Sequence, residues 1–172
     1  MRHMVTVVGR DRPGIVAALA QALYEAGCNL AEASMARLAG TFTVMVVVAC
    51  EGRDAAGLEA LLRPVAERLG LRVHVDPVEG EAGPSPEPDV RVTVSGADRA
   101  GIVARVAGAL AGAGVNILDL ESAVATGPGG PIYILHIEGQ AARGIEPVRE
   151  AMAAVAREGI DVSVRPVEPV VG

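Results

Sequence analysis

Several residue types are scarce or absent in this chain, and each scarcity argues against a class of function. Lysine is absent, so all 15 basic residues are arginines, whereas Schiff-base chemistry and P-loop nucleotide binding both depend on a lysine amine. Aromatic residues make up only 2% of the chain, too few for the stacking platforms of nucleic-acid binders. The net charge of −6 without any basic run also argues against direct DNA contact, which needs clustered cations.

Cysteine and histidine are scarce as well. Cys28 and Cys50 stand in no CxxC arrangement, so we expect two small buried apolar residues and no disulfide. His3, His74 and His136 lack metal-ligand spacing, and we expect neither a metal nor a cofactor. No apolar run reaches the length of a membrane span and no signal peptide opens the chain. A cytoplasmic protein without a membrane partner is expected.

Asparagine occurs only twice, and both copies occupy the same position in an internal repeat. The segment VTVVGRDRPGIVAALAQALYEAGCN begins at Val5, and VTVSGADRAGIVARVAGALAGAGVN begins at Val92, an offset of 87 residues. A repeat of this kind decides the architecture and must be recognised first. The two copies share Gly9/Gly96, Asp11/Asp98, Arg12/Arg99, Gly14/Gly101, Ile15/Ile102, Gly27/Gly114 and Asn29/Asn116. The polar members of this set, the aspartates, arginines and asparagines, are residues that a core alone does not require.

A segment rich in glycine, proline and acidic residues separates the repeats. It reads EGEAGPSPEPD from Glu79 to Asp89, and its prolines oppose both a helix and a central strand. The sequence therefore predicts two domains over 1–78 and 90–168, joined by a linker over 79–89. Halves of about 80 residues are marginally stable alone, so we expect them to pack side by side.

Each repeat shows the element order β-α-β-β-α-β. This order predicts an α+β protein made of two ferredoxin-like antiparallel sheets, each with its helices on one face and its first and third strands in the middle. The apolar run over 41–50 predicts a fully buried central strand, Pro64 should bend or divide the second helix, and a longer hairpin turn is expected over 126–130. The predicted strands cover 3–9, 30–38, 41–50, 90–96, 117–125 and 132–137, and a last alternating strand follows the second helix of each repeat. The predicted helices cover 14–26, 55–69, 101–113 and 146–157.

The turn from Gly9 to Gly14 is the first candidate binding site. Asp11 is expected to cap the following helix by accepting from amides of its first turn, and Gly14 permits close backbone approach. The helix N-terminus would attract a small carboxylate. Arg12 and Arg99 could add bidentate clamps or could face solvent. A single DR-x-G segment would be better explained by an ordinary helix cap and turn, and its recurrence in both repeats favours a binding role.

The two asparagines are the second candidate. Each follows a glycine, Gly27 or Gly114, at which a helix would end in a left-handed cap, and asparagine is common at helix ends. Its recurrence in both repeats favours a further role, because an amide can recognise an ammonium and a carboxylate together. Two repeats packed edge to edge would bring the turn of one beside the asparagine of the other.

With these motifs the two segments resemble the opening of ACT domains, which are small regulatory modules that bind amino acids. The tandem pair resembles the glycine cleavage system transcriptional repressor family. The resemblance implies ligand contacts from the first turn and from the start of the second strand of each repeat. These residues are Asp11, Arg12, Pro13, Gly14, Ile15, Asn29, Leu30, Asp98, Arg99, Gly101, Ile102, Asn116 and Ile117.

The second repeat departs from this pattern. Ala100 stands at the position of Pro13, and loss of proline gives the turn more freedom, so the second site is expected to be looser or empty. A pocket formed by a glycine-rich turn suggests a small amino acid such as glycine or serine as the ligand.

Two functions of different classes follow from these observations. The first is a non-catalytic, amino-acid-binding regulatory protein, expected as a homodimer, which acts on a transcription regulator of glycine or amino-acid metabolism through protein–protein contact. The second is a structural oligomerisation module without a ligand, built on the sheet edges. An enzyme is disfavoured, because no pair of residues stands out as general acid and base.

Overall fold

The computed structural model describes residues 1–79, 86–97 and 101–167, which divide into two compact units, Met1–Glu81 (unit 1) and Ala82–Gly172 (unit 2). Residues 80–85 of the expected linker lie outside the described residues. So do Asp98, Arg99 and Ala100 of the second turn, and residue 168.

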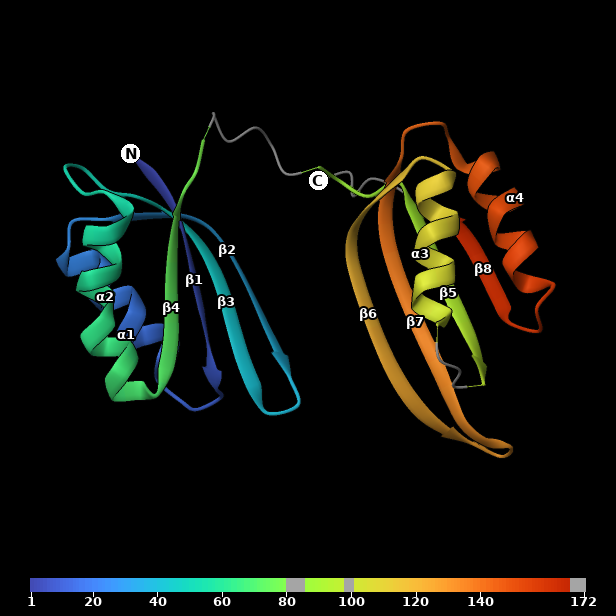
Figure 1. Ribbon diagram of the computed structural model, residues 1–172, viewed down its shortest axis with the longest axis horizontal. Helices are drawn as coiled ribbons and strands as arrows, with labels where there is room; N and C mark the ends of the chain where they lie inside the picture. The colour runs from blue at the N-terminus through green and yellow to red at the C-terminus, as the bar shows by residue number, and fades with distance from the viewer. Residues whose placement is uncertain (80–85, 98–100, 168–172) are drawn as a thin grey trace. The chain divides into compact units, whose positions relative to one another are not determined.

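Unit 1 has the predicted order of elements. Its sheet is antiparallel with the strand order β2-β3-β1-β4, so the first and third strands are central. Both helices lie on one face of this sheet (Figure 1). The predicted ferredoxin-like arrangement is confirmed. The elements are β1 (Arg2–Arg10), α1 (Ile15–Glu25), β2 (Asn29–Leu38), β3 (Thr41–Ala49), α2 (Ala55–Leu69) and β4 (Leu71–Pro77).

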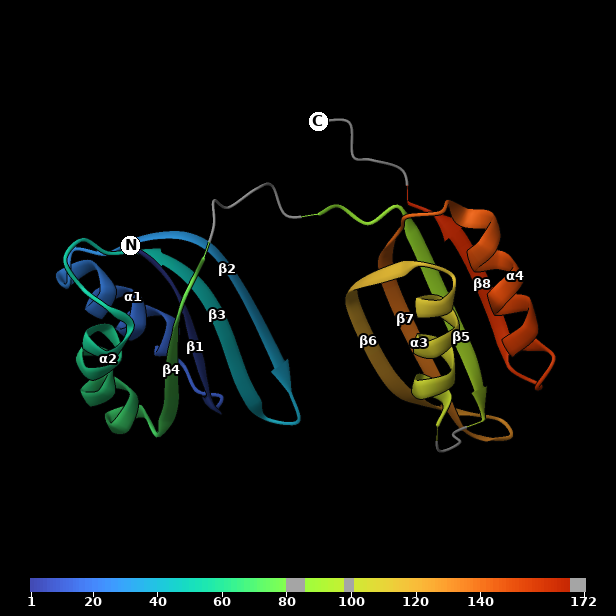
Figure 2. The ribbon, with the colours of Figure 1, turned by 45° about the horizontal axis from the view of Figure 1, so that its top comes forward.

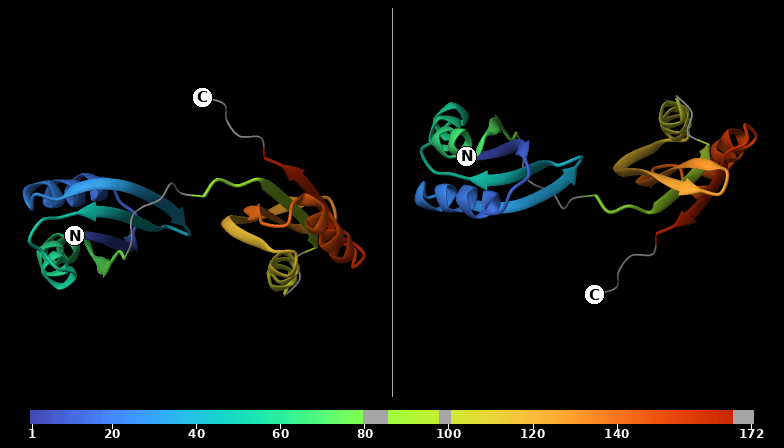
Figure 3. Two further views of the ribbon diagram at one scale, coloured as in Figure 1. Left: turned by 90° about the horizontal axis from the view of Figure 1, so that it is seen from above. Right: turned by 90° about the horizontal axis from the view of Figure 1, so that it is seen from below.

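Unit 2 repeats the same topology with the strand order β6-β7-β5-β8, and helices and sheet again form separate layers (Figures 2 and 3). The longer turn expected over 126–130 is wrong. β6 continues to Gly127 and β7 begins at Gly130, so the additional residues lengthen the hairpin strands instead of the turn. The elements are β5 (Val90–Ala97), α3 (Ile102–Gly112), β6 (Val115–Gly127), β7 (Gly130–Ala141), α4 (Ile145–Ala156) and β8 (Asp161–Pro166).

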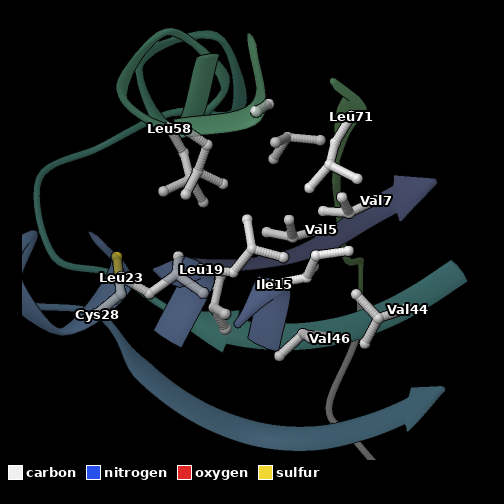
Figure 4. Packing of buried hydrophobic residues seen from close by; sticks show 14 of the residues in the cluster. Val5, Val7, Ile15, Leu19, Leu23, Cys28, Val44, Val46, Leu58 and Leu71 are labelled. Carbon is white, nitrogen blue, oxygen red and sulfur yellow. The ribbon is translucent and has the colours of Figure 1, made fainter. Parts of the chain in front are cut away.

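Each unit has its own core between the helices and one face of the sheet. In unit 1 the stripe of Ile15, Leu19 and Leu23 along one side of α1 is buried against the sheet (Figure 4). The helix α3 buries the matching stripe in unit 2. Burial of these aliphatic side chains supplies the main stabilisation of each unit, at about 25 cal/mol per Å² of apolar surface removed from water.

The prediction that 41–50 forms a fully buried strand is wrong in one respect. β3 is central, but its burial alternates: Val44, Val46 and Val48 are buried, whereas Met45 is 48% exposed. The helices cover only one face of the sheet, so an apolar sequence on both sides of the strand does not produce burial on both sides.

Pro64 does not divide the second helix, which was one of its two expected effects. α2 runs as one helix from Ala55 to Leu69 with Pro64 inside it. Its ends are well capped. The Asp54 carboxylate accepts from the Gly57 N–H at 2.8 Å, and Gly70 ends the helix in the left-handed conformation. These caps and the burial of Leu58 and Leu62 offset the lost backbone hydrogen bond.

The expectation that the two cysteines are unpaired is also wrong. Cys28 and Cys50 are buried, as expected, but they form a disulfide. Cys28 directly precedes β2 and Cys50 directly follows β3, and the neighbouring residues Asn29 and Ala49 are partners in the hairpin. This pairing places the two cysteine Cα atoms 4.4 Å apart. The link arises from tertiary pairing, which a separation of 22 residues does not reveal.

Candidate functional site

The turn after β1 leaves the start of α1 without a side-chain cap. Gly14 is the N-cap residue, in the left-handed conformation with φ 90°, and no side chain bonds to the first-turn amides. The prediction that Asp11 caps the helix is therefore wrong. Asp11 lies three residues before the N-cap; its N–H donates to the Gly40 carbonyl at 3.0 Å, and its carboxylate pairs elsewhere. The amides at the start of α1 remain available to an anionic group.

The Asp11 carboxylate forms an ion pair with Arg37 of β2. Arg37 Nη1 donates to Asp11 Oδ2 at 2.8 Å. The pKa of Arg37 is raised, first by this hydrogen bond and then by the attraction of the carboxylate. The pair joins the turn to the edge strand, and both side chains keep part of their surface in water.

A depression of about 330 Å³ lies beside this ion pair. Three kinds of group surround it: the polar turn, the backbone at the start of α1, and apolar side chains from α1, β2 and β3. The structure thus brings together Asp11, Arg12, Gly14 and Ile15, four of the predicted residues of the first turn. The lining residues are Asp11, Arg12, Gly14, Ile15, Val16, Ala17, Met35, Arg37 and Phe42.

Sequence reasoning missed Arg37 and Met35. A signal was present in the hairpin, because the turn at Ala39-Gly40 pairs Arg37 with Phe42. Phe42 is buried, so that register places Arg37 on the helix-covered face of the sheet. Met35, two residues before Arg37 on the same strand, lies on the same face.

Asn29 does not belong to this depression within one unit. Asn29 pairs with Ala49 at one end of β3, whereas Arg10, next to the turn, pairs with Thr41 at the other end of β3. Eight residues of strand correspond to about 26 Å, so the turn and Asn29 lie at opposite ends of the sheet. Leu30 lies beside Asn29, and both are exposed. Asn29 and Leu30 can therefore meet a first turn only if β2 packs against another sheet edge, as the edge-to-edge hypothesis supposed.

The ends of the two first helices agree with prediction. Gly27 and Gly114 both have positive φ, 72° and 80°, and they follow the last residues of α1 and α3. In unit 1 the Gly27 N–H donates to the Tyr24 carbonyl and the Cys28 N–H to the Leu23 carbonyl, which is a Schellman motif. This motif fixes the direction in which the chain enters β2 at Asn29.

The corresponding region of unit 2 differs. Gly101 repeats the left-handed N-cap, with φ 89° and no side-chain cap, and Ile102 is buried. Asn116 pairs with Gln140, directly after the first pair of β6, Val115 with Ala141, and a register shift follows Ile117. On the edge strand, Ser122 and Val124 occupy the positions of Met35 and Arg37, as their pairing with Leu135 and Tyr133 shows.

A second polar depression lies on the open face of the unit 2 sheet, away from its helices. It measures about 540 Å³ and contains the Arg91–Glu138 ion pair and a Thr93–His136 hydrogen bond. Across residues 1–79, 86–97 and 101–167, no group of three or more His, Cys, Asp or Glu side chains could hold a metal ion. No helix within these ranges is long and apolar enough to cross a bilayer.

Comparison with known protein families identifies the domains that contain these turns. Two models of the ACT domain match the chain, one over residues 2–76 and the other over residues 90–157. The chain is a tandem ACT-domain protein. Neither match is to a catalytic domain.

Individual relatives extend this result. The N-terminal ACT domain is UPF0237-like: UPF0237 protein YjhC of Lactococcus lactis is 41% identical over 75 residues, which are 44% of this chain and 86% of that protein. A protein of unknown function from Galdieria sulphuraria shares the fold with a TM-score of 0.82, 26% identity and coverage of 97% and 98% of the two chains. A candidate glycine cleavage system transcriptional repressor shares the fold with a TM-score of 0.75, 17% identity and 97% coverage of both chains.

Proposed function

We propose that this ACT protein is a non-catalytic regulator that binds an α-amino acid at the turn between β1 and α1. The observation that carries the proposal is the depression beside Asp11. There an uncapped helix start, a carboxylate and a guanidinium converge. An α-amino acid presents a carboxylate and an ammonium close together, which such a mixed set of groups recognises.

The edge strand β2 supports assembly into a homodimer. All ten residues of β2 are exposed, and β2 lies at the end of the strand order of unit 1, so no other strand of the described residues pairs with its outer edge. An unpaired strand edge can hydrogen-bond to another chain. Antiparallel pairing of two β2 strands about a two-fold axis would bring the Asn29 end of one copy toward the Leu38 end of the other, near its turn. Asn29 would then complete the site of the second copy.

The proposed output is a change in contact with another protein. A ligand bound between the β2 edges of two copies would favour the dimer with paired β2 strands over the unpaired form. A partner protein that binds only one of these two forms would then respond to the ligand. Following the sequence resemblance, we take a transcription regulator of glycine or amino-acid metabolism as this partner. The net charge of −6 supports protein contact over direct contact with DNA.

A thermal-shift panel of the standard amino acids tests the proposal on the full chain. A ligand at 100 times its Kd stabilises the protein by about 2.7 kcal/mol, which is a readily measured shift. Glycine and serine are the first ligands to examine, since the glycine-rich turn suggested them. If no amino acid produces a shift at millimolar concentration, the regulatory function is wrong.

The exposure of the whole β2 edge also favours the second candidate, a structural oligomerisation module. The variant Asp11→Ala/Asn29→Ala separates the two functions. An amino-acid regulator should lose its ligand-dependent association with this variant. A structural module should associate equally well with or without the substitutions and with or without amino acids.

A further inference from the structure

Resting on the proposed function, we infer that Arg37 anchors the ligand carboxylate, that unit 1 alone carries this anchor, and that the ligand has a medium-sized apolar side chain. Arg37 belongs to β2, outside the first turn and the start of the second strand from which the ligand contacts were predicted. The presence of Arg37 distinguishes this site from a helix start that only lacks a side-chain cap.

The guanidinium of Arg37 has unused donors. A guanidinium carries five N–H bonds, and Arg37 donates only from Nη1, to Asp11 Oδ2. Within the described residues Nε and Nη2 take part in no hydrogen bond. The Arg37 side chain is 65% exposed, so this edge of the fork is open to a planar carboxylate, which it matches in bidentate geometry.

Asp11 supplies the opposite charge in the same depression. Its Oδ2 accepts from Arg37, and the carboxylate does not cap the helix, so Oδ1 remains for a ligand ammonium. An α-amino acid would then place its carboxylate on Arg37 and its ammonium on Asp11. Both charged groups of the ligand would meet charges already held in position by their own ion pair.

The remaining walls are apolar and open. Val16 and Met35 are 54% and 55% exposed, and Phe42 lies with them in the lining. A ligand side chain that covers Val16 and Met35 removes apolar surface from water, which strengthens binding about fourfold for each buried methylene. Glycine would leave this surface exposed. The lining therefore favours an amino acid such as leucine, valine or methionine over glycine and serine.

Unit 2 lacks the cation and one part of the apolar wall. Val124 stands where unit 1 has Arg37, and Ser122 stands where it has Met35. Both exchanges occur although Gly101 keeps the same left-handed cap. The difference between the two sites thus lies on the edge strand in addition to the turn, where Ala100 replaces Pro13.

Titration calorimetry of the full chain tests the assignment with three probes: L-leucine, L-leucinamide, which lacks the carboxylate, and glycine. The wild-type protein should bind leucine at least tenfold more tightly than either leucinamide or glycine. Arg37→Val, which installs the unit 2 residue, should weaken leucine at least tenfold and leave leucinamide unchanged. Arg37→Gln should behave like Arg37→Val, and far-ultraviolet circular dichroism confirms that both variants fold.

The matched control is Arg63→Ala. Arg63 is as exposed as Arg37 and pairs with Glu59 on α2, so its loss changes the net charge equally but should leave leucine binding unchanged. Wild-type leucine affinity in folded Arg37→Val would overturn the anchor and leave the proposed function intact. Glycine bound as tightly as leucine would overturn the apolar ligand class. Absence of binding by every amino acid would overturn the proposed function itself.

Discussion

Unit 1 closes its β2–β3 hairpin with a disulfide, whereas unit 2 closes the same hairpin with an apolar pair. The positions of Cys28 and Cys50 correspond to Val115 and Ala141, which face each other in the β6–β7 register. Both members of the apolar pair are 8% exposed. The fold therefore does not require a covalent link here. It requires only small or branched side chains that fill the end of the core.

The open sheet faces differ more strongly. On the open face of unit 1 the central strands carry Met4, Met45 and Val47. The equivalent positions of unit 2 carry Arg91, His136 and Glu138. The covered faces of both sheets remain aliphatic. Packing against helices constrains one face of each strand, and the other face is free to diverge. Differences between the units therefore indicate separate roles on the open side.

The disulfide should give the largest difference between the units. In Cys28→Val/Cys50→Ala, which installs the unit 2 pair, we expect unit 1 to lose about 3 kcal/mol, because closure of a loop of 22 residues no longer restricts the unfolded chain. Urea unfolding with and without a reductant measures this effect. Reductant should destabilise the wild type to a similar degree and leave the variant unaffected. Equal stability of wild type and variant without reductant would contradict the prediction.

The N-cap glycines should respond alike in both units. Gly14 and Gly101 have φ near 90°, and a Cβ at either position would meet no atom within 4 Å. Substitution by alanine therefore adds backbone strain and no steric clash, which costs about 1.5 kcal/mol. Gly14→Ala and Gly101→Ala should each lower stability by this amount in urea unfolding. A loss confined to one variant would show that the two turns are not conformationally equivalent.

The fold was largely predictable because the repeat and the periodic apolar pattern agree. The helical stripe Ile15, Leu19 and Leu23 fixed the buried face of α1, and the order of elements fixed the sheet. Pairing across the hairpin was the part that local sequence could not supply. It joins Cys28 to Cys50 and brings Arg37 to Asp11.

The candidate site was predicted only in part for the same reason. Glycine and asparagine signals are local, so Gly14 and Gly27 were interpreted correctly as special backbone positions. The role of Asp11 depended on which residue became the N-cap. Because the left-handed Gly14 takes that place, the carboxylate is released to pair with a strand distant in sequence.

His3 provides a smaller contrast. It is 2% exposed, and its Nδ1 has no hydrogen-bond partner in the described part of the chain, whereas unit 2 has the aliphatic Val90 at this position. An unsatisfied buried polar atom is costly, so His3→Val should raise stability by about 1 kcal/mol after a small loss of packing. Chemical denaturation measures the change. A lower stability would mean that the imidazole makes a favourable interaction with buried water.

The smallest expected effect concerns the charged open face of unit 2. Arg91 pairs with Glu138 on one side and lies opposite Arg165 on the other. In Glu138→Val, which installs the residue found at Val47, Arg91 keeps only its like-charged neighbour, so we expect a loss of about 0.5 kcal/mol. The loss should shrink in 0.5 M salt, since the side chains are solvated and screening is strong.

The variant Arg91→Met/Glu138→Val reproduces the Met4–Val47 pair of unit 1 and completes this comparison. It removes both charges, so the repulsion between Arg91 and Arg165 disappears and much of the stability lost in Glu138→Val should be recovered. A double-mutant cycle measured by urea unfolding isolates the coupling between Arg91 and Glu138. Additive effects of the two substitutions would mean that the pair contributes nothing. The charges on this face would then serve recognition or solubility, since neither the sheet nor its register would depend on them.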